Sequence, residues 1–324
     1  MTQAGFVRAV TVVMPVYDDW ATAETLLRRL DEELLRRGIG ADVLLVDDGS
    51  TEPAPARVSR LSSIASLTVL ELRRNLGHQR ALCVALAHVH AVGVEGPLVV
   101  MDADGEDSPA DVSRLLNEYA RREGKVAVFA ARAKRAERLL FRTLYRLYQV
   151  LHRLLVGQSV RVGNFSVLPS SFLDTLAVSS DLWNHYAATV FRARLPVAIL
   201  PVDRAQRLGG RSRMSLADLA LHGLSAMSVY SDIIGVRMLF ASAALIVLAL
   251  AGFTGALVAG SRMGATLTGS ATGSAALLVS VLLQLLLLSL VFCFILLRGR
   301  SGPGFLPLRD CAYFVRGSRA IQHD

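Results

Sequence analysis

The N-terminal part of the chain alternates short apolar runs with longer segments in which apolar residues recur at helical spacing. The run Val-Thr-Val-Val-Met-Pro-Val at 10–16 is apolar and β-branched, as expected of a strand buried on both faces of a sheet. In the segment 21–37, leucines recur at helical spacing between charged residues, and the pattern stops at Gly38. A strand, a helix and a second strand in this order predict a right-handed parallel unit. Continuing the same pattern gives predicted strands at 42–46, 67–72, 97–101, 126–130 and 197–202, and predicted helices at 79–92 and 111–123. The sequence therefore predicts an α/β fold with a mostly parallel sheet.

Two further segments have the pattern of amphipathic helices. Residues 136–156 space leucines against arginines, which fits a helix on a membrane surface and equally an ordinary helix with a solvated arginine face. The pattern alone does not say what the apolar face packs against, so both interpretations stay open. Residues 216–234 place apolar side chains on one side, and we expect this helix to lie along the membrane interface.

Two long apolar stretches lie near the C-terminus. Residues 238–259 and 271–297 carry no charged side chain, and each is long enough to cross a hydrocarbon core of ~30 Å as a helix. A helix buried in a soluble core would need only about 10–14 apolar residues. We therefore predict a two-helix transmembrane hairpin, which agrees with a hydrophobic content of 52%.

The distribution of arginine predicts the orientation of this hairpin. Arg262 is the only basic residue in the short connection between the spans, whereas arginines flank the first span and follow the second. The N-terminus leads directly into a strand-like run, so we expect no signal peptide. These features predict an inner-membrane protein whose large N-terminal part and both termini are cytoplasmic, and the Ala- and Arg-rich composition suggests a bacterial source.

Composition also argues against two other classes of protein. The net charge of +8 suits a protein beside an anionic membrane leaflet, and no module with basic and aromatic residues indicates nucleic-acid binding. The three cysteines lack metal-ligand spacing, and a cytoplasmic setting disfavours disulfides. The histidines His78, His185 and His222 have no partner at zinc spacing, so we interpret them as packed or hydrogen-bonded residues.

The most informative polar stretch is Asp-Ala-Asp-Gly-Glu at 102–106. It follows the predicted strand 97–101, and the carboxyl ends of parallel strands form the edge at which α/β sheets bind ligands. Asp102 and Asp104, one residue apart, suit a hard divalent cation that bridges to phosphates. Asp47 and Asp48 end the second strand at the same predicted edge. A solvated acidic turn is the alternative interpretation, and this shared edge argues against it.

Basic loops complete the candidate site. The stretch Arg-Leu-Gly-Gly-Arg-Ser-Arg at 207–213 combines arginines with glycines that let backbone N–H groups approach a phosphate, although a basic loop beside the membrane would look the same. A second basic loop contains Arg132 and Arg135. Planar guanidinium groups form paired hydrogen bonds with phosphate oxygens, so these residues are candidates for holding phosphate groups.

Taken in order, these motifs resemble those of the family 2 glycosyltransferases. The resemblance rests on Pro-Val-Tyr at 15–17, Asp-Asp-Gly-Ser at 47–50, Asp-Ala-Asp at 102–104 and the arginine loop at 207–213. Within the family, the chain is similar to polyprenyl-phosphate glycosyltransferases related to dolichol-phosphate mannose synthase, which carry a C-terminal pair of spans. The resemblance covers about 10–297 and implies a GT-A fold, with a Rossmann-like sheet.

The resemblance implies a role for each matching residue. Pro15, Tyr17, Asp47 and Asp48 would bind the base and ribose of the donor nucleotide, and Asp19 and Asp102 are further donor-binding candidates. Mg²⁺ or Mn²⁺ would lie on Asp102 and Asp104, with Glu106 as a third candidate ligand. Relatives commonly have Gln at the position of Glu106, and a carboxylate there is a good ligand for a hard cation. Asn164 replaces an Asp that is common in relatives. The residues expected at the phosphates of donor and acceptor are Arg132, Arg135, Arg207, Ser212 and Arg213, and Asp102, Asp104 and Arg207 are the expected catalytic residues.

The expected reaction is inverting transfer of a single sugar from a UDP- or GDP-linked donor to a polyprenyl phosphate at the cytoplasmic membrane face. Two alternatives remain: a processive polysaccharide synthase, although the chain lacks the Q-x-x-R-W segment of such enzymes, and a non-catalytic membrane scaffold with a decayed transferase domain. The sequence leaves open whether the protein forms a homo-oligomer. The expected divisions are a GT-A domain at 1–210, an interfacial helix at 211–235, a membrane hairpin at 236–297 and a basic cytoplasmic tail at 298–324.

Overall fold

The computed structural model describes residues 7–132, 150, 153–157, 162–203, 205, 207–209, 216–262, 269–301 and 304–323. The chain forms two compact units, each of which is described by itself. The first comprises Met1–Glu137, Val160–Val229 and Phe305–Asp324, and the second comprises Arg138–Ser159 and Tyr230–Gly304.

The first unit contains an eight-stranded sheet with the strand order β8-β6-β7-β5-β1-β2-β4-β9. Strand β1 pairs in parallel with β2 and β5, β2 pairs in parallel with β4, and β6 pairs in parallel with β8. Strands β7 and β9 are antiparallel to their neighbours. The predicted α/β fold with a mostly parallel sheet is confirmed. The strands are β1 Ala9–Val16, β2 Gly40–Asp47, β4 Ile64–Leu72, β5 Pro97–Val100, β6 Ala127–Arg132, β7 Ser166–Pro169, β8 Val197–Val202 and β9 Val315–Ala320.

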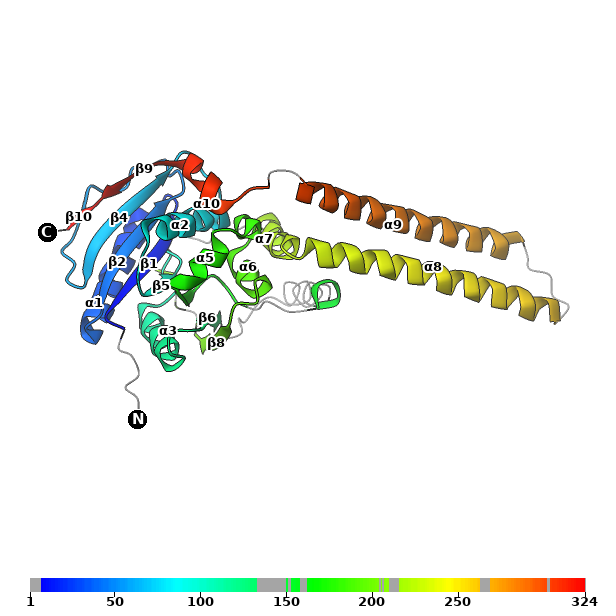
Figure 1. Cartoon of the computed structure of the whole chain (residues 1–324), viewed down its shortest axis with the longest axis horizontal. Helices are drawn as coiled ribbons and strands as arrows, with labels where there is room; N and C mark the ends of the chain where they lie inside the picture. Colours follow the sequence, from blue (N-terminus) through cyan, green and yellow to red (C-terminus); the bar gives the residue numbers. More distant parts are fainter. Residues whose placement is uncertain are drawn as a thin grey trace. The chain divides into compact units, whose positions relative to one another are not determined.

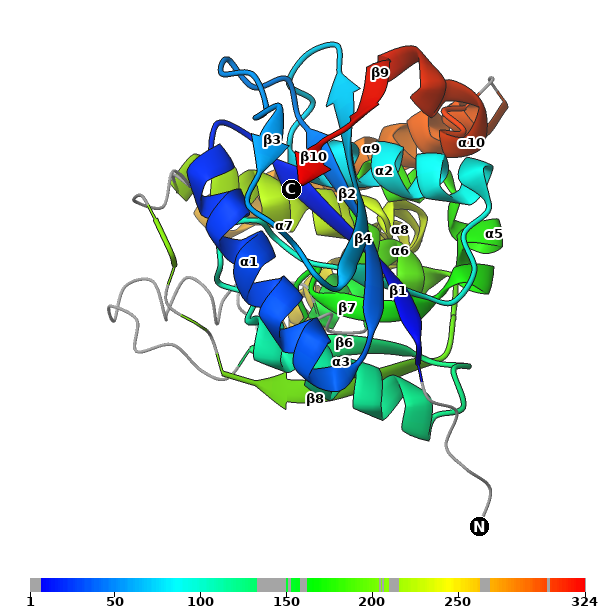
Figure 2. The same cartoon turned by 90° about the vertical axis from the view of Figure 1, so that its left-hand side faces the viewer.

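Helices cover both faces of this sheet (Figure 2). One apolar cluster joins a sheet face to α1 and α3, and a second cluster joins the other face to α2, α5 and α6. The sheet is therefore buried on both sides, which explains why its central strands are apolar at almost every position. The helices of this unit are α1 Trp20–Arg37, α2 His78–Val92, α3 Pro109–Arg121, α5 Leu173–Leu176, α6 Tyr186–Arg192 and α7 Leu216–Ser228.

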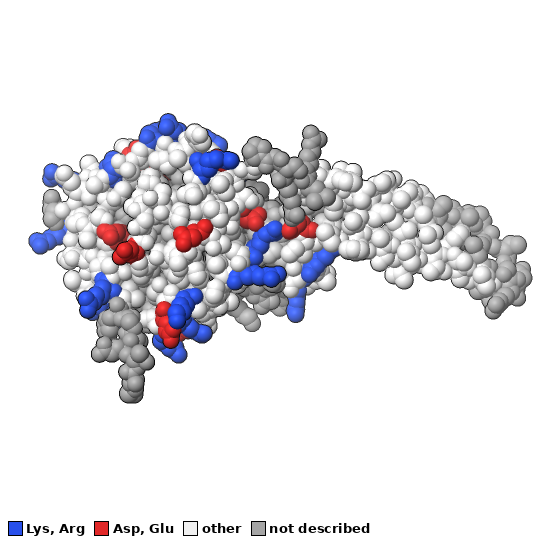
Figure 3. Space-filling view, viewed as in Figure 1, with Lys and Arg blue, Asp and Glu red and all other residues white. Residues whose placement is uncertain are grey.

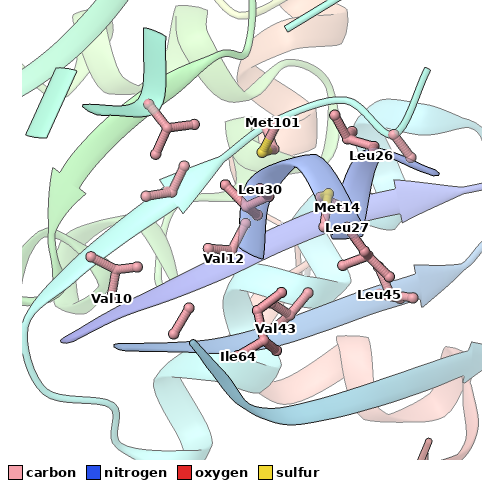
Figure 4. Packing of buried hydrophobic residues seen from close by; sticks show 14 of the residues in the cluster. Val10, Val12, Met14, Leu26, Leu27, Leu30, Val43, Leu45, Ile64 and Met101 are labelled. Carbon is pink, nitrogen blue, oxygen red and sulfur yellow. The ribbon is translucent and has the colours of Figure 1, made fainter. Parts of the chain in front are cut away.

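The packing of α1 shows how the sequence pattern becomes a core. Leu26, Leu27 and Leu30 face Val12 and Met14 of β1, and all five are at most 1% exposed (Figure 4). Each such side chain contributes about 1.5–3 kcal/mol relative to exposure. The helix ends at Gly38 (φ 64°), whose N–H bonds the carbonyl oxygens of the last turn. This packing fixes the two strands that flank α1, and with them the residues at their carboxyl ends.

The C-terminal segment belongs to the same unit. Here α10 (Pro307–Asp310) precedes β9, which pairs with β4 at the sheet edge, and β10 (Gln322–His323) pairs with β3 (Arg57–Val58). The guanidinium of Arg319 lies 3.0 Å from the Glu71 carboxylate and also donates to the carbonyl oxygen of Ala54 at 2.6 Å. Residues 305–323, part of the segment that the sequence analysis described as a basic tail, thus extend the sheet.

The second unit contains the two longest helices, α8 (Ser231–Arg262) and α9 (Gly269–Ser301) (Figure 1). Their most apolar stretches are Ser231–Ala256 and Leu277–Leu296, with mean hydropathies of 2.4 and 2.8. Both are long and apolar enough to cross a membrane, and the sequence of α8 contains no charged residue between Arg237 and Arg262. In Figure 3 most of the described surface of the two long helices is white, without Lys, Arg, Asp or Glu. The hydroxyls of Ser242 and Ser289 lie 3.3 Å apart between the two helices.

Two helix predictions differ from the structure or cannot be compared with it. The single helix predicted at 216–234 is two helices, because α7 ends at Ser228 and α8 begins at Ser231. Apolar periodicity continues across this break, so the pattern did not reveal it. Most of the helix predicted at 136–156 lies outside the described residues, although 153–156 are helical.

Candidate active site

The candidate residues lie at the carboxyl ends of three neighbouring strands, β5, β1 and β2. These strands are parallel, and Val16 of β1 is in register with Asp47 of β2. The N–H of Asp48 bonds the carbonyl oxygen of Val16 at 2.9 Å, and the N–H of Met101 bonds that of Val13 at 3.1 Å. The acidic groups after the strands therefore share one edge of the sheet, as the sequence predicts.

The end of β1 is tied to the loop after β2. Pro15 is buried in β1, whereas the Tyr17 side chain is 41% exposed. Asp18 has a positive φ of 48°, and its Oδ1 accepts from the N–H groups of Thr51 at 2.7 Å and Glu52 at 3.3 Å. These bonds hold the ends of the two strands together and leave the Tyr17 ring accessible at the edge.

Both aspartates after β2 are engaged by main-chain donors. Asp47 accepts from the N–H of Ser50 at 2.8 Å, and Asp48 accepts from the N–H groups of Leu76 at 2.7 Å and Gly77 at 2.9 Å. Burial raises the pKa of Asp48, and the two main-chain bonds oppose this rise in part. Asp48 thus anchors the loop between β4 and α2. Its predicted contact with the nucleotide stays a prediction.

Gly49 is required where this loop approaches the next one. Its φ is +70°, and a Cβ atom there would lie 2.5 Å from the backbone of Arg74 and Asn75. Only glycine allows this approach without moving the main chain. The Asp-Asp-Gly-Ser motif therefore has a structural function in addition to any contact with a nucleotide.

The acidic loop after β5 is held by its own side chains. Asp107, 1% exposed, accepts from the N–H of Asp102 at 2.9 Å, and Asp104 accepts from the N–H of Glu106 at 2.9 Å. The side chains of Asp102 and Asp104 remain 29% and 22% exposed. The two carboxylates are therefore oriented but still reachable from solvent.

The loop that carries Arg207 lies against this acidic loop. The N–H of Leu208 bonds the carbonyl oxygen of Asp104 at 3.2 Å, and the N–H of Ala205 bonds that of Glu106 at 3.3 Å. The guanidinium of Arg207 lies 3.6 Å from the Asp104 carboxylate and 3.7 Å from that of Asp19. Three candidate residues, from distant parts of the sequence, thus form one charged group.

Several other predicted residues cannot be placed. Arg135, Ser212 and Arg213 lie outside the described residues, and so does the side chain of Arg132. The backbone of Arg132 ends strand β6. The predicted roles of these four residues at the phosphates stay predictions.

The structure adds polar residues that the sequence analysis did not assign to the site. His78, at the start of α2, places its Nε2 atom 3.2 Å from Oδ1 of Asp102 and 2.8 Å from Nδ2 of Asn164. Partial burial opposes the charged form of His78, but the Asp102 carboxylate outweighs it and raises the pKa of the imidazole. The sequence held one signal that His78 belongs to the site, which is its position in the loop after a predicted strand. The contact itself depends on tertiary structure.

Two more histidines lie in this region. The rings of His185 and His222 have centroids 4.8 Å apart. Burial, together with repulsion from His222 and His78, lowers the pKa of His185 to about 3, and burial also lowers the pKa of His222. Both are therefore neutral at physiological pH. The sequence interpretation of His185 as a hydrogen-bonded residue agrees with its Nδ1 atom, which accepts from the N–H of Ala188 at 3.3 Å.

The donor set suits a metal that is shared with a phosphorylated ligand. Among the described residues, no group of three or more His, Cys, Asp or Glu side chains could hold a metal ion alone. Asp102 and Asp104 offer carboxylate oxygens, and Mg²⁺ in particular is commonly bound by one or two carboxylates together with substrate phosphates. The residues present therefore fit a divalent cation that arrives with a diphosphate.

Comparison with known proteins identifies the family of this domain. Residues 11–170 match the family model described as Glycosyl transferase family 2. Undecaprenyl-phosphate 4-deoxy-4-formamido-L-arabinose transferases from Salmonella paratyphi B and Salmonella newport are each 25% identical to the chain over 228 residues. These alignments cover 68% of this chain and 66% of the relatives, so the chain spans just under two thirds of their length.

Solved structures of similar proteins include glucosyl-3-phosphoglycerate synthase from Mycobacterium tuberculosis with Mn²⁺, UDP and glucosyl-3-phosphoglycerate. It is 18% identical, with a TM-score of 0.46, and the match covers 70% of this chain and 80% of that one. The family match spans the strands from β1 to β7, and with the mostly parallel sheet it confirms the expected GT-A fold class. The chain thus contains a domain that matches the family 2 glycosyltransferases.

Proposed function

We propose that this glycosyltransferase moves a single sugar from a nucleotide diphosphate sugar to a polyprenyl phosphate, with inversion at the anomeric carbon. The observation that carries the proposal is the charged group of Asp19, Asp104 and Arg207 beside Asp102 at the shared strand edge. The same chain has two helices apolar enough to cross a membrane. Carboxylates suit a cation on the donor diphosphate, and a guanidinium suits phosphate oxygens.

The acceptor is inferred from two features. The relatives named above are undecaprenyl-phosphate transferases, which supports a polyprenyl phosphate as acceptor. The helices α8 and α9 would keep the enzyme at the membrane in which such a lipid resides. Neither feature distinguishes among polyprenols, sugars, or UDP and GDP donors.

The chemistry needs little acid–base catalysis from the protein. A phosphate monoester is already ionised at neutral pH because its second pKa is about 6. A divalent cation, Mg²⁺ or Mn²⁺, supplies neutralisation of the charge on the leaving diphosphate. Asp102 and Asp104 would hold it, and Arg207 would bind phosphate oxygens once it leaves Asp104. The neutral state of His185 and the amide at Asn164 agree with a mechanism that lacks a strong general base.

The location follows from connectivity and charge. Both flanks of the α8–α9 hairpin, 216–229 and 305–323, belong to the unit that contains the candidate site. If both helices span the membrane, this unit lies entirely on one side. The arginine excess outside the hairpin connection supports the cytoplasmic side of the inner membrane.

Product stereochemistry and metal dependence test the proposal. Detergent-purified protein would be incubated with undecaprenyl phosphate and a nucleotide sugar, and the anomeric configuration of the glycolipid would be determined by NMR. We expect inversion, abolition of transfer by EDTA, and recovery with Mn²⁺ or Mg²⁺. Retention of configuration would contradict single displacement, and full activity in EDTA would contradict the metal role of Asp102 and Asp104.

A further inference from the structure

An amide side chain lies within the most apolar stretch of α9. Gln284 belongs to the stretch Leu277–Leu296, which has a mean hydropathy of 2.8. At a rise of about 1.5 Å per residue, Gln284 lies about 10 Å inside the N-terminal end of this stretch. If α9 crosses a membrane, a hydrocarbon core of ~30 Å therefore surrounds the Gln284 side chain.

Gln284 lies on the side of α9 that is turned away from α8. The side toward α8 is marked by Ser289, whose hydroxyl lies 3.3 Å from that of Ser242, and by Leu282, one heptad earlier, which is 8% exposed. At about 100° per residue, Gln284 points in nearly the opposite direction. It is exposed, and so is Leu277, seven residues before it.

The hairpin offers this amide no partner at its own depth. The contact between Ser242 and Ser289 pairs the two helices so that Gln284 is level with Val247 of α8. Residues 243–253 of α8 contain only Ala, Leu, Ile, Val, Gly and Phe. With the residues that the structure describes, the Gln284 side chain forms no hydrogen bond.

An amide without a hydrogen bond is expensive in hydrocarbon, so a partner is expected outside the hairpin. A second copy in the same orientation provides one, because rotation about an axis along the membrane normal keeps each residue at its depth. The amide of Gln is also self-complementary. The NH₂ group of each Gln284 can donate to the carbonyl oxygen of the other.

We propose that the outer face of α9 is an interaction surface for a second copy of this chain, with Gln284 near its centre. Its apolar part consists of exposed residues at spacings of three and four around Gln284, as in the helix contacts of a left-handed bundle, which are Leu277, Val281, Leu288, Val291 and Ile295. The inference rests on the proposed membrane location of α8 and α9 and is independent of the proposed reaction.

The first test measures self-association of the full chain in liposomes by energy transfer between copies that carry donor and acceptor dyes at the N-terminus. We expect energy transfer that rises with the protein-to-lipid ratio, and association that is about 5- to 30-fold weaker in Gln284→Leu. Gln284→Asn keeps an amide and should associate more strongly than Gln284→Leu. Equal association of the wild-type protein and Gln284→Leu would overturn the inference.

The second test locates the contact by cysteine cross-linking. It uses a Cys293→Ala background, because Cys293 lies on the same helix and is partly exposed. Gln284→Cys is compared with Leu285→Cys, at nearly the same depth but about 100° further round the helix, where the native side chain is 44% exposed. With copper phenanthroline as oxidant, we expect disulfide-linked dimers from Gln284→Cys and few from Leu285→Cys. Equal yields would indicate random collision and would overturn the contact.

Three further outcomes separate this inference from the proposed function. Release of the protein from membranes by alkaline carbonate would overturn the membrane location and the Gln284 contact together. Stable insertion without energy transfer would overturn the contact alone and would assign the amide to a different membrane partner. Self-association through Gln284 in a protein that transfers no sugar would support the contact and overturn the proposed reaction.

Discussion

At the scale of single residues, a substitution in the acidic loop can test catalysis separately from folding stability. The Asp104 carboxylate faces Arg207, and one of its oxygens accepts from the N–H of Glu106. An Asn side chain can still accept from this N–H but has no charge to offer a cation. We expect Asp104→Asn to lower transfer by about 100-fold or more and to change the free energy of unfolding by less than about 0.5 kcal/mol.

The measurement compares turnover and denaturant unfolding in this variant and in Asp174→Asn. Asp174 loses the same charge from a side chain that is 74% exposed on α5. Wild-type turnover by Asp104→Asn would remove Asp104 from the active site, whereas loss of turnover in both variants would indicate a general effect of charge.

Gly49 gives a second prediction at this scale. A Cβ atom there would meet the backbone of Arg74 and Asn75, whereas at Gly38 nothing lies within 4 Å of the same atom. Both glycines have positive φ, so alanine is strained at both positions. We expect Gly49→Ala to destabilise by about 2–4 kcal/mol and Gly38→Ala by only about 1 kcal/mol, measured by chemical denaturation. Equal losses of stability in the two variants would show that the close approach of the two loops is not the reason for glycine at position 49.

At the scale of elements, α6 links protonation to stability. His185 caps this helix, and its pKa of about 3 in the folded protein is below the ordinary value of 6.5. The unfolded chain therefore binds a proton at a higher pH than the folded one does, so stability falls as pH falls below 6.5. Between pH 7 and pH 5 this residue alone lowers the free energy of unfolding by about 2 kcal/mol.

His185→Asn tests this linkage because an Asn side chain can accept from the Ala188 N–H but does not titrate. We expect the variant to lose about 2 kcal/mol less than the wild-type protein between pH 7 and pH 5, measured by urea unfolding at each pH. An identical pH dependence in the two proteins would mean that His185 is not the group that takes up the proton.

The C-terminal strand β9 provides the other prediction for an element. Arg319 joins it to Glu71 of β4 and to the carbonyl oxygens of Ala54 and Pro55. Arg316, on the same strand, is exposed. We expect Arg319→Ala to cost about 1–2 kcal/mol of stability and Arg316→Ala less than about 0.5 kcal/mol, measured by thermal unfolding. Equal losses of stability in the two variants would indicate that the loss of a positive charge, and not the loss of these contacts, destabilises β9.

The elements that escaped prediction have weak sequence signals for physical reasons. Strand β7 contains only Ser-Val-Leu-Pro and follows a polar stretch, so neither length nor alternation marks it. Strand β9, Val-Arg-Gly-Ser-Arg-Ala, lies at a sheet edge, where polar and charged side chains are tolerated, and it has the composition of a basic tail. Strands buried on both faces, such as β1, were found because burial requires continuous apolar sequence.

At the scale of the whole molecule, the sequence could predict which residues share the strand edge, because parallel topology decides this. It could not predict that Arg207 lies 3.6 Å from Asp104, or that His78 and Asn164 meet beside Asp102. Those contacts depend on how loops of irregular conformation pack. The charge pattern indicated the chemistry of the site, and the tertiary structure adds the groups that orient it.

The central claim is that one sugar is transferred to a polyprenyl phosphate. The most direct measurement incubates detergent-purified protein and Mn²⁺ with undecaprenyl phosphate and a panel of UDP- and GDP-linked sugars, followed by mass spectrometry of the lipid. We expect a lipid that gains the mass of one sugar from one donor, and no such product with Asp104→Asn. Lipids that carry several sugars would indicate a processive synthase. No product from any donor, together with no nucleotide binding, would contradict a transferase and favour a non-catalytic scaffold.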